Sequence, residues 1–301
     1  MQELRSLFRL LILLALGWPS TSLSQQGFRI DLPKEEEYKD RLLRSEKTKD
    51  GKLSYPSRLV QNTVTHYNFT YNAARKLNEV LQKAKAANRD DYNTLLPFYN
   101  FNLTTTRKDS IDLDSVIQKA SSGIALHDLR NDWNDNLYLL WGMAYYLQEK
   151  FDSAYQVFQF INYYYAPREK DGYFKSIGSG RDGNRANSIA SEEKTGLLNK
   201  MGAAPPKRNE ALLWIIRTQL AQEQFAEAAG LLETLRNDPA FPKRLKTELE
   251  ELTALSFYNQ DRWDSAAFHL SKALEGASTP NEKARWEFLT GQLFERAGNY
   301  A

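Results

Sequence analysis

A spaced pattern of large aromatic and small residues in the second half of the chain constrains the fold most. Its first copy consists of Tyr138, Trp141, Gly142, Tyr145, Ala154, Phe158 and Pro167. Small residues let two antiparallel helices approach where they cross, and the large side chains fill the space around the crossing. This stretch therefore predicts a pair of antiparallel helices with Gly142 at the crossing.

The pattern returns with Ile216, Ala254 and Gly291 at the position of Gly142. Positions 216, 254 and 291 are 38 and 37 residues apart, slightly more than the roughly 34 residues of a tetratricopeptide (TPR) repeat. Positions 142 and 216 are 74 apart, because an insert lies between them. We predict an all-α fold in which a TPR-type helix-pair solenoid over 133–301 follows additional N-terminal helices. The last repeat is truncated, which predicts that a longer natural chain continues beyond Ala301. In the given sequence, the pattern predicts no partner helix for Leu289, Leu293 and Phe294.

Residues 57–132 form a predicted N-terminal helical region. Helical spacing predicts one long helix over about 57–87, with an apolar face of Leu59, Thr63, His66, Tyr67, Ala74, Leu77 and Leu81. Asp91 opens a short segment that Pro97 ends, and Asp112 or Asp114 starts the next helix. The face of that helix consists of Val116, Ile117, Ala120, Ile124, Ala125 and Leu126.

The N-terminus has the pattern of a cleavable signal peptide over 1–24. Arg5 and Arg9 precede an apolar run at 10–18, and Ser22 and Ser24 provide a small-x-small cleavage site. Residues 25–56 are highly charged and predict a flexible lead-in. Secreted chains without cysteine are typical of a bacterial periplasm rather than of disulfide-rich extracellular spaces.

Composition restricts the chemistry. The chain has no cysteine, only three widely separated histidines, and 40 Lys+Arg against 38 Asp+Glu. Such a balance disfavours a nucleic-acid partner. The string Gly178–Gly183 matches a dinucleotide fingerprint but lacks the preceding strand that the fingerprint needs. No catalytic, cofactor-binding or metal-ligating set is predicted, and an enzyme is not expected.

A glycine-rich, basic insert at 167–208 separates the first two repeats. It carries aromatic and basic side chains of the kind enriched at interfaces, namely Tyr173, Phe174, Arg181 and Arg185. We expect the insert to contact a partner rather than to support the fold; a passive linker is the alternative.

TPR arrays bind partners on the concave face that the first helix of each pair lines. On that face the register places a mixed polar and aromatic set of residues, suited to a peptide or protein partner: Asn136, Met143, Tyr146, Glu210, Arg217, Glu251, Tyr258 and Gln292.

Five stretches resemble the SprE/PorW family of TPR proteins of Bacteroidota: 66–72, 92–97, 133–146, 151–161 and 206–214. The resemblance implies a periplasmic protein, peripheral to the outer membrane, that binds other components of the type IX secretion and gliding machinery and has no transmembrane span. The family is typically lipid-anchored through a cysteine, which this chain lacks. The chain is then either soluble in the periplasm or held at the membrane by partners.

Two other functions remain open. One is a general periplasmic peptide- or protein-binding TPR adaptor, and the other is a cell-envelope glycan-processing enzyme. An acidic pair in a deep pocket would favour the enzyme, whereas a broad groove would favour binding.

Overall fold

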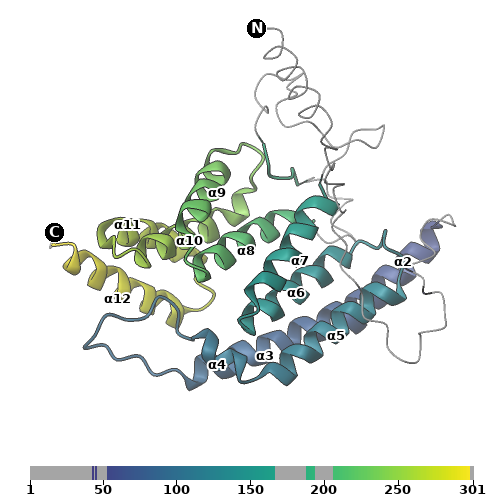
Figure 1. Cartoon of the computed structure of the whole chain (residues 1–301), viewed down its shortest axis with the longest axis horizontal. Helices are drawn as coiled ribbons and strands as arrows, with labels where there is room; N and C mark the ends of the chain where they lie inside the picture. Colours follow the sequence, from purple (N-terminus) through teal and green to yellow (C-terminus); the bar gives the residue numbers. More distant parts are fainter. Residues whose placement is uncertain (1–42, 44, 46–52, 167–187, 194–205, 299–301) are drawn as a thin grey trace, which may run out of the picture. The chain divides into compact units, whose positions relative to one another are not determined.

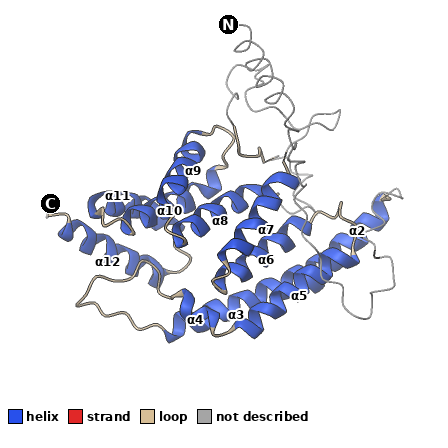
Figure 2. Cartoon of the chain, viewed as in Figure 1, coloured by secondary structure: helices blue, strands red, loops and turns tan. Residues whose placement is uncertain are grey.

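Helices account for all the regular structure in the computed structural model wherever it describes the chain, which is at residues 43, 45, 53–166, 188–193 and 206–298 (Figure 2). No strand occurs among these residues, so the predicted all-α class is confirmed for them. All of them belong to one unit, Leu32–Ala301. The predicted signal peptide at 1–24 lies outside the described residues.

A long helix opens the described part, as predicted for 57–87. It consists of α2 (Tyr55–Val64), a π-helical turn η2 (Thr65–Thr70) and α3 (Tyr71–Ala87). The predicted apolar face is wrong at Leu59 and Tyr67, which are 54% and 61% exposed, and at Thr63, which is exposed as well. The wider π turn shifts the phase of the helix, and polar side chains take the inner positions of α2.

Those inner polar side chains bind the loop before α6. Asn62 Nδ2 donates to Asp132 Oδ2 (2.6 Å), and Asn131 Nδ2 donates to Thr65 Oγ1 (2.8 Å). Gln61 Oε1 accepts from the Asp128 backbone N–H (2.9 Å). Buried polar groups need such partners, and an apolar-periodicity argument does not register them.

Residues 88–102 contain no helix, and Asp91 instead forms a turn in which its carboxylate accepts the Asn93 N–H (3.0 Å). The short helix α4 (Leu103–Arg107) follows, and α5 (Ser110–Leu126) starts earlier than the predicted Asp112 or Asp114. The reason is local, because α5 follows almost directly on α4 and the Leu113 N–H already bonds to the Asp109 carbonyl (3.1 Å).

The predicted helix pairs are present. They are α6 (Asn134–Leu147) with α7 (Phe151–Tyr164), α8 (Arg208–Ala221) with α9 (Phe225–Asn237), and α10 (Lys246–Tyr258) with α11 (Trp263–Ala273). Short 3-10 turns η4 (Lys243–Leu245) and η5 (Leu274–Gly276) precede α10 and follow α11, and α12 (Pro280–Arg296) packs on α11 (Figure 1). From α6 to α12, consecutive helices are in contact, and so are α6 with α8 and α8 with α10.

The same turn closes every pair. Glu149, Glu223 and Asp261 occupy equivalent positions with φ of 60°, 59° and 56°, the left-handed region. The next residue bonds back to the preceding helix, for example Lys150 N–H to the Tyr145 carbonyl (2.9 Å). An aromatic residue then starts each second helix: Phe151, Phe225 and Trp263.

The crossing inside the first pair confirms the predicted role of Gly142. A Cβ placed there would lie under 3.0 Å from three ring carbons of Phe158. Ala154, Ala228 and Ala266, which share one register position in the second helices, are all fully buried.

Two expectations about the ends of the array need correction. Leu289 and Leu293 are fully buried although the sequence pattern gives them no partner helix, and α12 packs against α11. In the predicted flexible lead-in, Leu43 and Ser45 are buried, and the Ser45 N–H bonds to the Ala125 carbonyl of α5 (3.3 Å).

Candidate functional site

The first helices of the pairs, α6, α8 and α10, share one face with α12, which we call the inner face. The connection from α3 to α4, residues 88–102, lies beside α12 (Figure 1) and also bonds to α8 and α10; we call it the crossing loop. A cavity of about 440 Å³ remains between the loop, the inner face and α3. This volume is within the range of roughly 300–1,000 Å³ that is usual for ligand sites. Apolar side chains dominate its wall, among them Leu81, Phe101, Met143, Leu220, Leu255 and Trp286.

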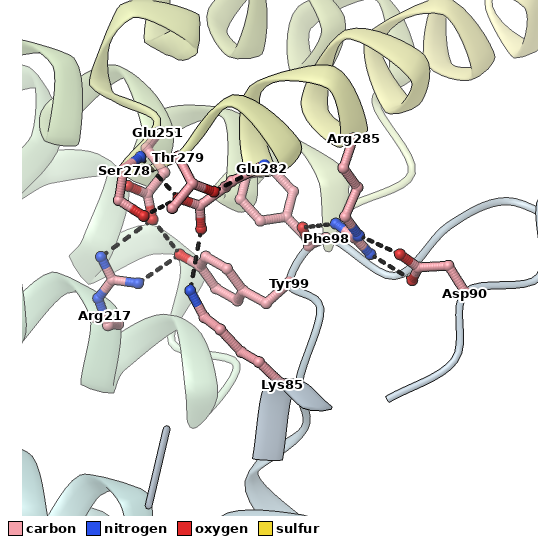
Figure 3. A network of polar contacts seen from close by, with 10 residues as sticks. All are labelled: Lys85, Asp90, Phe98, Tyr99, Arg217, Glu251, Ser278, Thr279, Glu282 and Arg285. Atoms are coloured by element: carbon pink, nitrogen blue, oxygen red, sulfur yellow. Dashed lines mark hydrogen bonds and ion pairs between the residues drawn. The ribbon is translucent and has the colours of Figure 1, made fainter. Parts of the chain in front are cut away.

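Tyr99 of the crossing loop is the polar centre of the site (Figure 3). Its hydroxyl donates to Glu251 Oε1 (2.7 Å) and accepts from Arg217 Nη1 (2.5 Å). Burial raises the pKa of Tyr99 well above its ordinary value, so the hydroxyl stays protonated and keeps its donor. Arg217 also pairs with Glu251 (3.2 Å) and Glu248 (3.4 Å), and its guanidinium lies 5.0 Å from the ring centroid of Trp214.

Arg285 of α12 binds the crossing loop through its whole guanidinium group. Its Nε donates to Asp90 Oδ2 (2.7 Å) and its Nη1 to the Phe98 carbonyl (2.9 Å) (Figure 3). Its Nη2 donates to the Pro97 carbonyl (2.6 Å). The hydrogen bonds from Arg285 hold the pKa of Asp90 below its ordinary value, so the pair stays charged at neutral pH.

Two further side chains bind only the backbone of the loop. Gln292 accepts the Leu96 N–H (3.0 Å) and donates to the Thr94 carbonyl (2.7 Å), while the Tyr258 hydroxyl donates to the Leu96 carbonyl (2.9 Å). Leu96 and Phe98 are buried, and Pro97 between them is exposed. This alternation is that of an extended chain lying on a surface.

An ion pair between α3 and α12 borders the same cavity. Lys85 Nζ lies 3.2 Å from Glu282 Oε1, and the Ser278 N–H donates to the other carboxylate oxygen (2.8 Å). Of the acidic side chains that line the cavity, Glu251 and Glu282 are thus both paired with a cation.

Six of the eight residues predicted for the concave face come together here. Met143, Tyr146, Arg217 and Glu251 line the cavity, and Tyr258 and Gln292 bind the crossing loop.

The other two lie elsewhere, on the first turns of α6 and α8. Asn136 donates to the neighbouring Asp135, and Glu210 pairs with Lys207 (2.7 Å) and Arg244 (2.9 Å). Both residues therefore lie at the ends of α6 and α8 that are nearest to where the insert 167–208 joins the array.

Sequence reasoning missed Arg285 and the crossing loop. The alternation of Leu96, Pro97 and Phe98 between two helices indicates an extended, half-buried segment. No local signal, however, says that it packs on α10 and α12, more than 150 residues further along.

Tyr173, Phe174, Arg181 and Arg185 lie outside the described residues. Another part of the insert is held firmly: the Asp238 carboxylate accepts from Ser188 Oγ (2.7 Å) and from the Ile189 and Ala190 N–H groups (2.8 Å each). Asn209 exchanges two hydrogen bonds with the Ser191 backbone (2.8 Å each). The expectation that the insert does not support the fold is therefore wrong for residues 188–193.

Within the described ranges, no group of three or more His, Cys, Asp or Glu side chains is placed to hold a metal ion. No described helix is both long and apolar enough to cross a bilayer. No protein-family model matches the chain, and no curated protein is significantly similar to it. In this structure the inner face binds an extended stretch of backbone, residues 94–98 of the crossing loop.

Proposed function

We propose that this chain is a TPR-type scaffold that binds extended segments of partner proteins on its inner face and catalyses no reaction. One observation carries the proposal. The inner face already holds residues 94–98 through side-chain hydrogen bonds to their backbone, supplied by Tyr258, Arg285 and Gln292.

The repeated turn geometry supports the TPR-type array. Glu149, Glu223 and Asp261 adopt the same left-handed conformation at corresponding positions, and a buried alanine follows each one in the second helix. Stacked helix pairs of this kind produce one continuous face from the first helix of every pair, which suits an extended ligand.

Binding is also supported over hydrolysis of a glycan. General acid–base catalysis needs carboxylates that are free to exchange protons. Glu251 and Glu282 instead accept hydrogen bonds from Arg217, Tyr99, Lys85 and Ser278.

The resemblance to the SprE/PorW family suggests where this scaffold acts and which proteins it binds. We propose that it acts in the periplasm, peripheral to the outer membrane, and binds other components of the type IX secretion and gliding machinery. A general periplasmic peptide- or protein-binding adaptor remains the second candidate, because backbone hydrogen bonds do not select one partner sequence.

The test is capture of partners from native membranes by the immobilised chain. Met143→Arg places a charge in the cavity wall and should reduce capture at least tenfold, because a buried unpaired charge excludes an apolar segment. Ala229→Arg is the matched control, since it adds the same charge at an exposed position of α9. It should leave capture within about twofold of the unmodified chain.

Circular dichroism and thermal melts establish that both variants are folded. Equal capture by a folded Met143→Arg variant and the unmodified chain would refute binding on the inner face. Mass spectrometry of the captured proteins distinguishes the two candidate functions. Secretion components would support a role in the secretion machinery, and unrelated periplasmic proteins would support a general adaptor.

A further inference from the structure

We infer that the crossing loop is an internal ligand: it occupies the peptide site of the inner face and leaves when an extended segment of a partner protein binds there. The inference rests on the proposed function and adds two things to it, the kind of segment bound and the control of its access.

The loop lies on the inner face in the way a bound peptide would. Four of its carbonyls, at Thr94, Leu96, Pro97 and Phe98, are bound by side chains rather than by other backbone, and so is the Leu96 N–H. In the added-strand mode of peptide recognition, backbone bonds give affinity and alternate side chains enter pockets. The loop follows the same logic, with Leu96 and Phe98 buried and Pro97 exposed.

The crossing loop can also detach from the inner face. Connections longer than about 12 residues without secondary structure are uncommon in compact proteins and are usually functional or disordered. Residues 91–94 are exposed, and no described backbone-to-backbone bond ties residues 95–101 to the inner face. A segment held by side-chain contacts alone can open locally, at the cost of those contacts, without unfolding the helices on which it packs.

Both ends of the loop are fixed independently of it. Leu77, Val80 and Ala84 of α3 are buried in the core. After the loop, Thr106 Oγ1 donates to the Leu147 carbonyl (2.8 Å), and Arg107 pairs with Glu149 (3.0 Å). The loop can therefore swing off the inner face while α3 and α4 stay in place.

The contacts define the segment that replaces it. It is extended, it carries apolar side chains at two alternate positions and an aromatic one after them, and it is uncharged along the bound stretch. Neutrality follows because the charged side chains of the face already have partners: Arg217 is paired with Glu248 and Glu251, and Lys85 with Glu282. Arg285 is paired with Asp90, which precedes the bound stretch 94–98. Arg217 Nε is buried without a hydrogen-bond partner, so it offers a donor to one further carbonyl.

The test uses the full chain and a fluorescent synthetic peptide with the sequence of residues 92–101. A tethered loop competes at an effective concentration in the millimolar range, so the unmodified chain should bind the peptide weakly. The double variant Leu96→Ala, Phe98→Ala removes the two buried anchors of the tethered copy. It should bind the peptide at least tenfold more tightly, because the weakened tethered copy competes less for the site.

Gln292→Ala added to that double variant should weaken peptide binding at least tenfold. Glu295→Ala is its matched control, because it shortens an exposed side chain on the same helix that makes none of these bonds. A folded double variant that binds no more tightly than the unmodified chain would overturn the proposal.

The unmodified chain provides a second measurement that does not depend on the folding of a variant. In the ¹⁵N-labelled protein, saturating unlabelled peptide should speed hydrogen exchange of the Leu96 N–H at least tenfold, because Gln292 no longer binds it. Unchanged exchange would overturn the proposal. Dimers on gel filtration with unchanged exchange would assign the inner face to a second copy and would likewise overturn it.

The experiments distinguish a failure of loop displacement from a failure of partner binding on the inner face. If Met143→Arg abolishes partner capture but the loop variant gains no affinity, the loop is a fixed part of the fold and the scaffold function stands. If the loop variant gains affinity but Met143→Arg captures partners normally, partners bind elsewhere.

Discussion

At the scale of single residues, Gly142 has the role that the sequence pattern predicts most specifically, which is to let two antiparallel helices cross closely. Its missing side chain leaves space for the ring of Phe158, which itself stacks on Trp214 of the next pair (ring centroids 5.8 Å apart). One atom added at this position disturbs the contact inside the first pair and the contact with the second.

Gly142→Ala should therefore lower the free energy of unfolding by about 1–3 kcal/mol through overpacking. Gly230→Ala on α9 is the matched control. A Cβ there meets nothing within 4 Å, and the better helix propensity should raise stability by up to about 1 kcal/mol. Denaturant melts of both variants check this, and equal effects would mean that the crossing is not tightly packed.

Asp135 makes stability depend on pH. Burial raises its pKa from 3.8 to about 6, although the Lys207 and Asn136 N–H groups bond to it. Between these values the folded chain binds more protons than the unfolded chain, so stability falls as pH rises from about 4 to about 6 and is level above. The loss from this group should be about 1–3 kcal/mol.

Asp135→Asn removes the titration and should flatten this part of the profile. The measurement is the difference between the two proteins in free energy of unfolding at pH 4 and pH 7. Parallel profiles would contradict a raised pKa at Asp135.

At the scale of elements, the turn inside each helix pair uses a left-handed residue that is not glycine. Glu223 has φ 59° and is exposed. A left-handed non-glycine residue costs about 1–2 kcal/mol, and glycine relieves it at some cost in unfolded-chain entropy.

Glu223→Gly should thus raise the free energy of unfolding by about 0.5–1 kcal/mol. Glu233→Gly, also exposed but inside α9, should lower it by a similar amount, about 0.5–1 kcal/mol. Melts of the pair decide the matter, and destabilisation by both substitutions would count against the turn geometry.

Asp238 joins the insert to the array, because it binds Ser188, Ile189 and Ala190 together. Asp238→Ala leaves two backbone N–H groups without their partner and should lower the free energy of unfolding by about 2–3 kcal/mol. It should also speed hydrogen exchange at Ile189 and Ala190.

Asp264→Ala, at an exposed site in the first turn of α11, is the control for Asp238 and should cost less than about 1 kcal/mol. If Asp238→Ala changes neither stability nor exchange, residues 188–193 do not support the fold and the insert is independent of the array.

At the scale of the whole molecule, the features that repeat along the sequence can be predicted from it, whereas the features that occur once cannot. The helix pairs follow from a spacing that recurs in each copy, and the role of Gly142 follows from the residue pattern of the first copy. The π-helical turn at 65–70 breaks helical periodicity, so the buried face of α2 is assigned wrongly. The crossing loop and Arg285 carry no periodic signal, and their contacts join residues nearly 200 positions apart.

The same reasoning explains the candidate site. Register alone brings Met143, Tyr146, Arg217 and Glu251 to one face, because successive first helices pack side by side. What occupies that face depends on a segment before the array, whose path only tertiary contacts determine.

Binding of extended partner segments on the inner face is the proposed function of the whole molecule. Its most direct test is photo-cross-linking in native envelopes from a benzoylphenylalanine placed at Met143 in the cavity wall or at Ala229 on α9. We expect cross-links from position 143 to apolar, extended partner segments and few from position 229. Cross-links from position 229 alone, or the same partners from both positions, would contradict it.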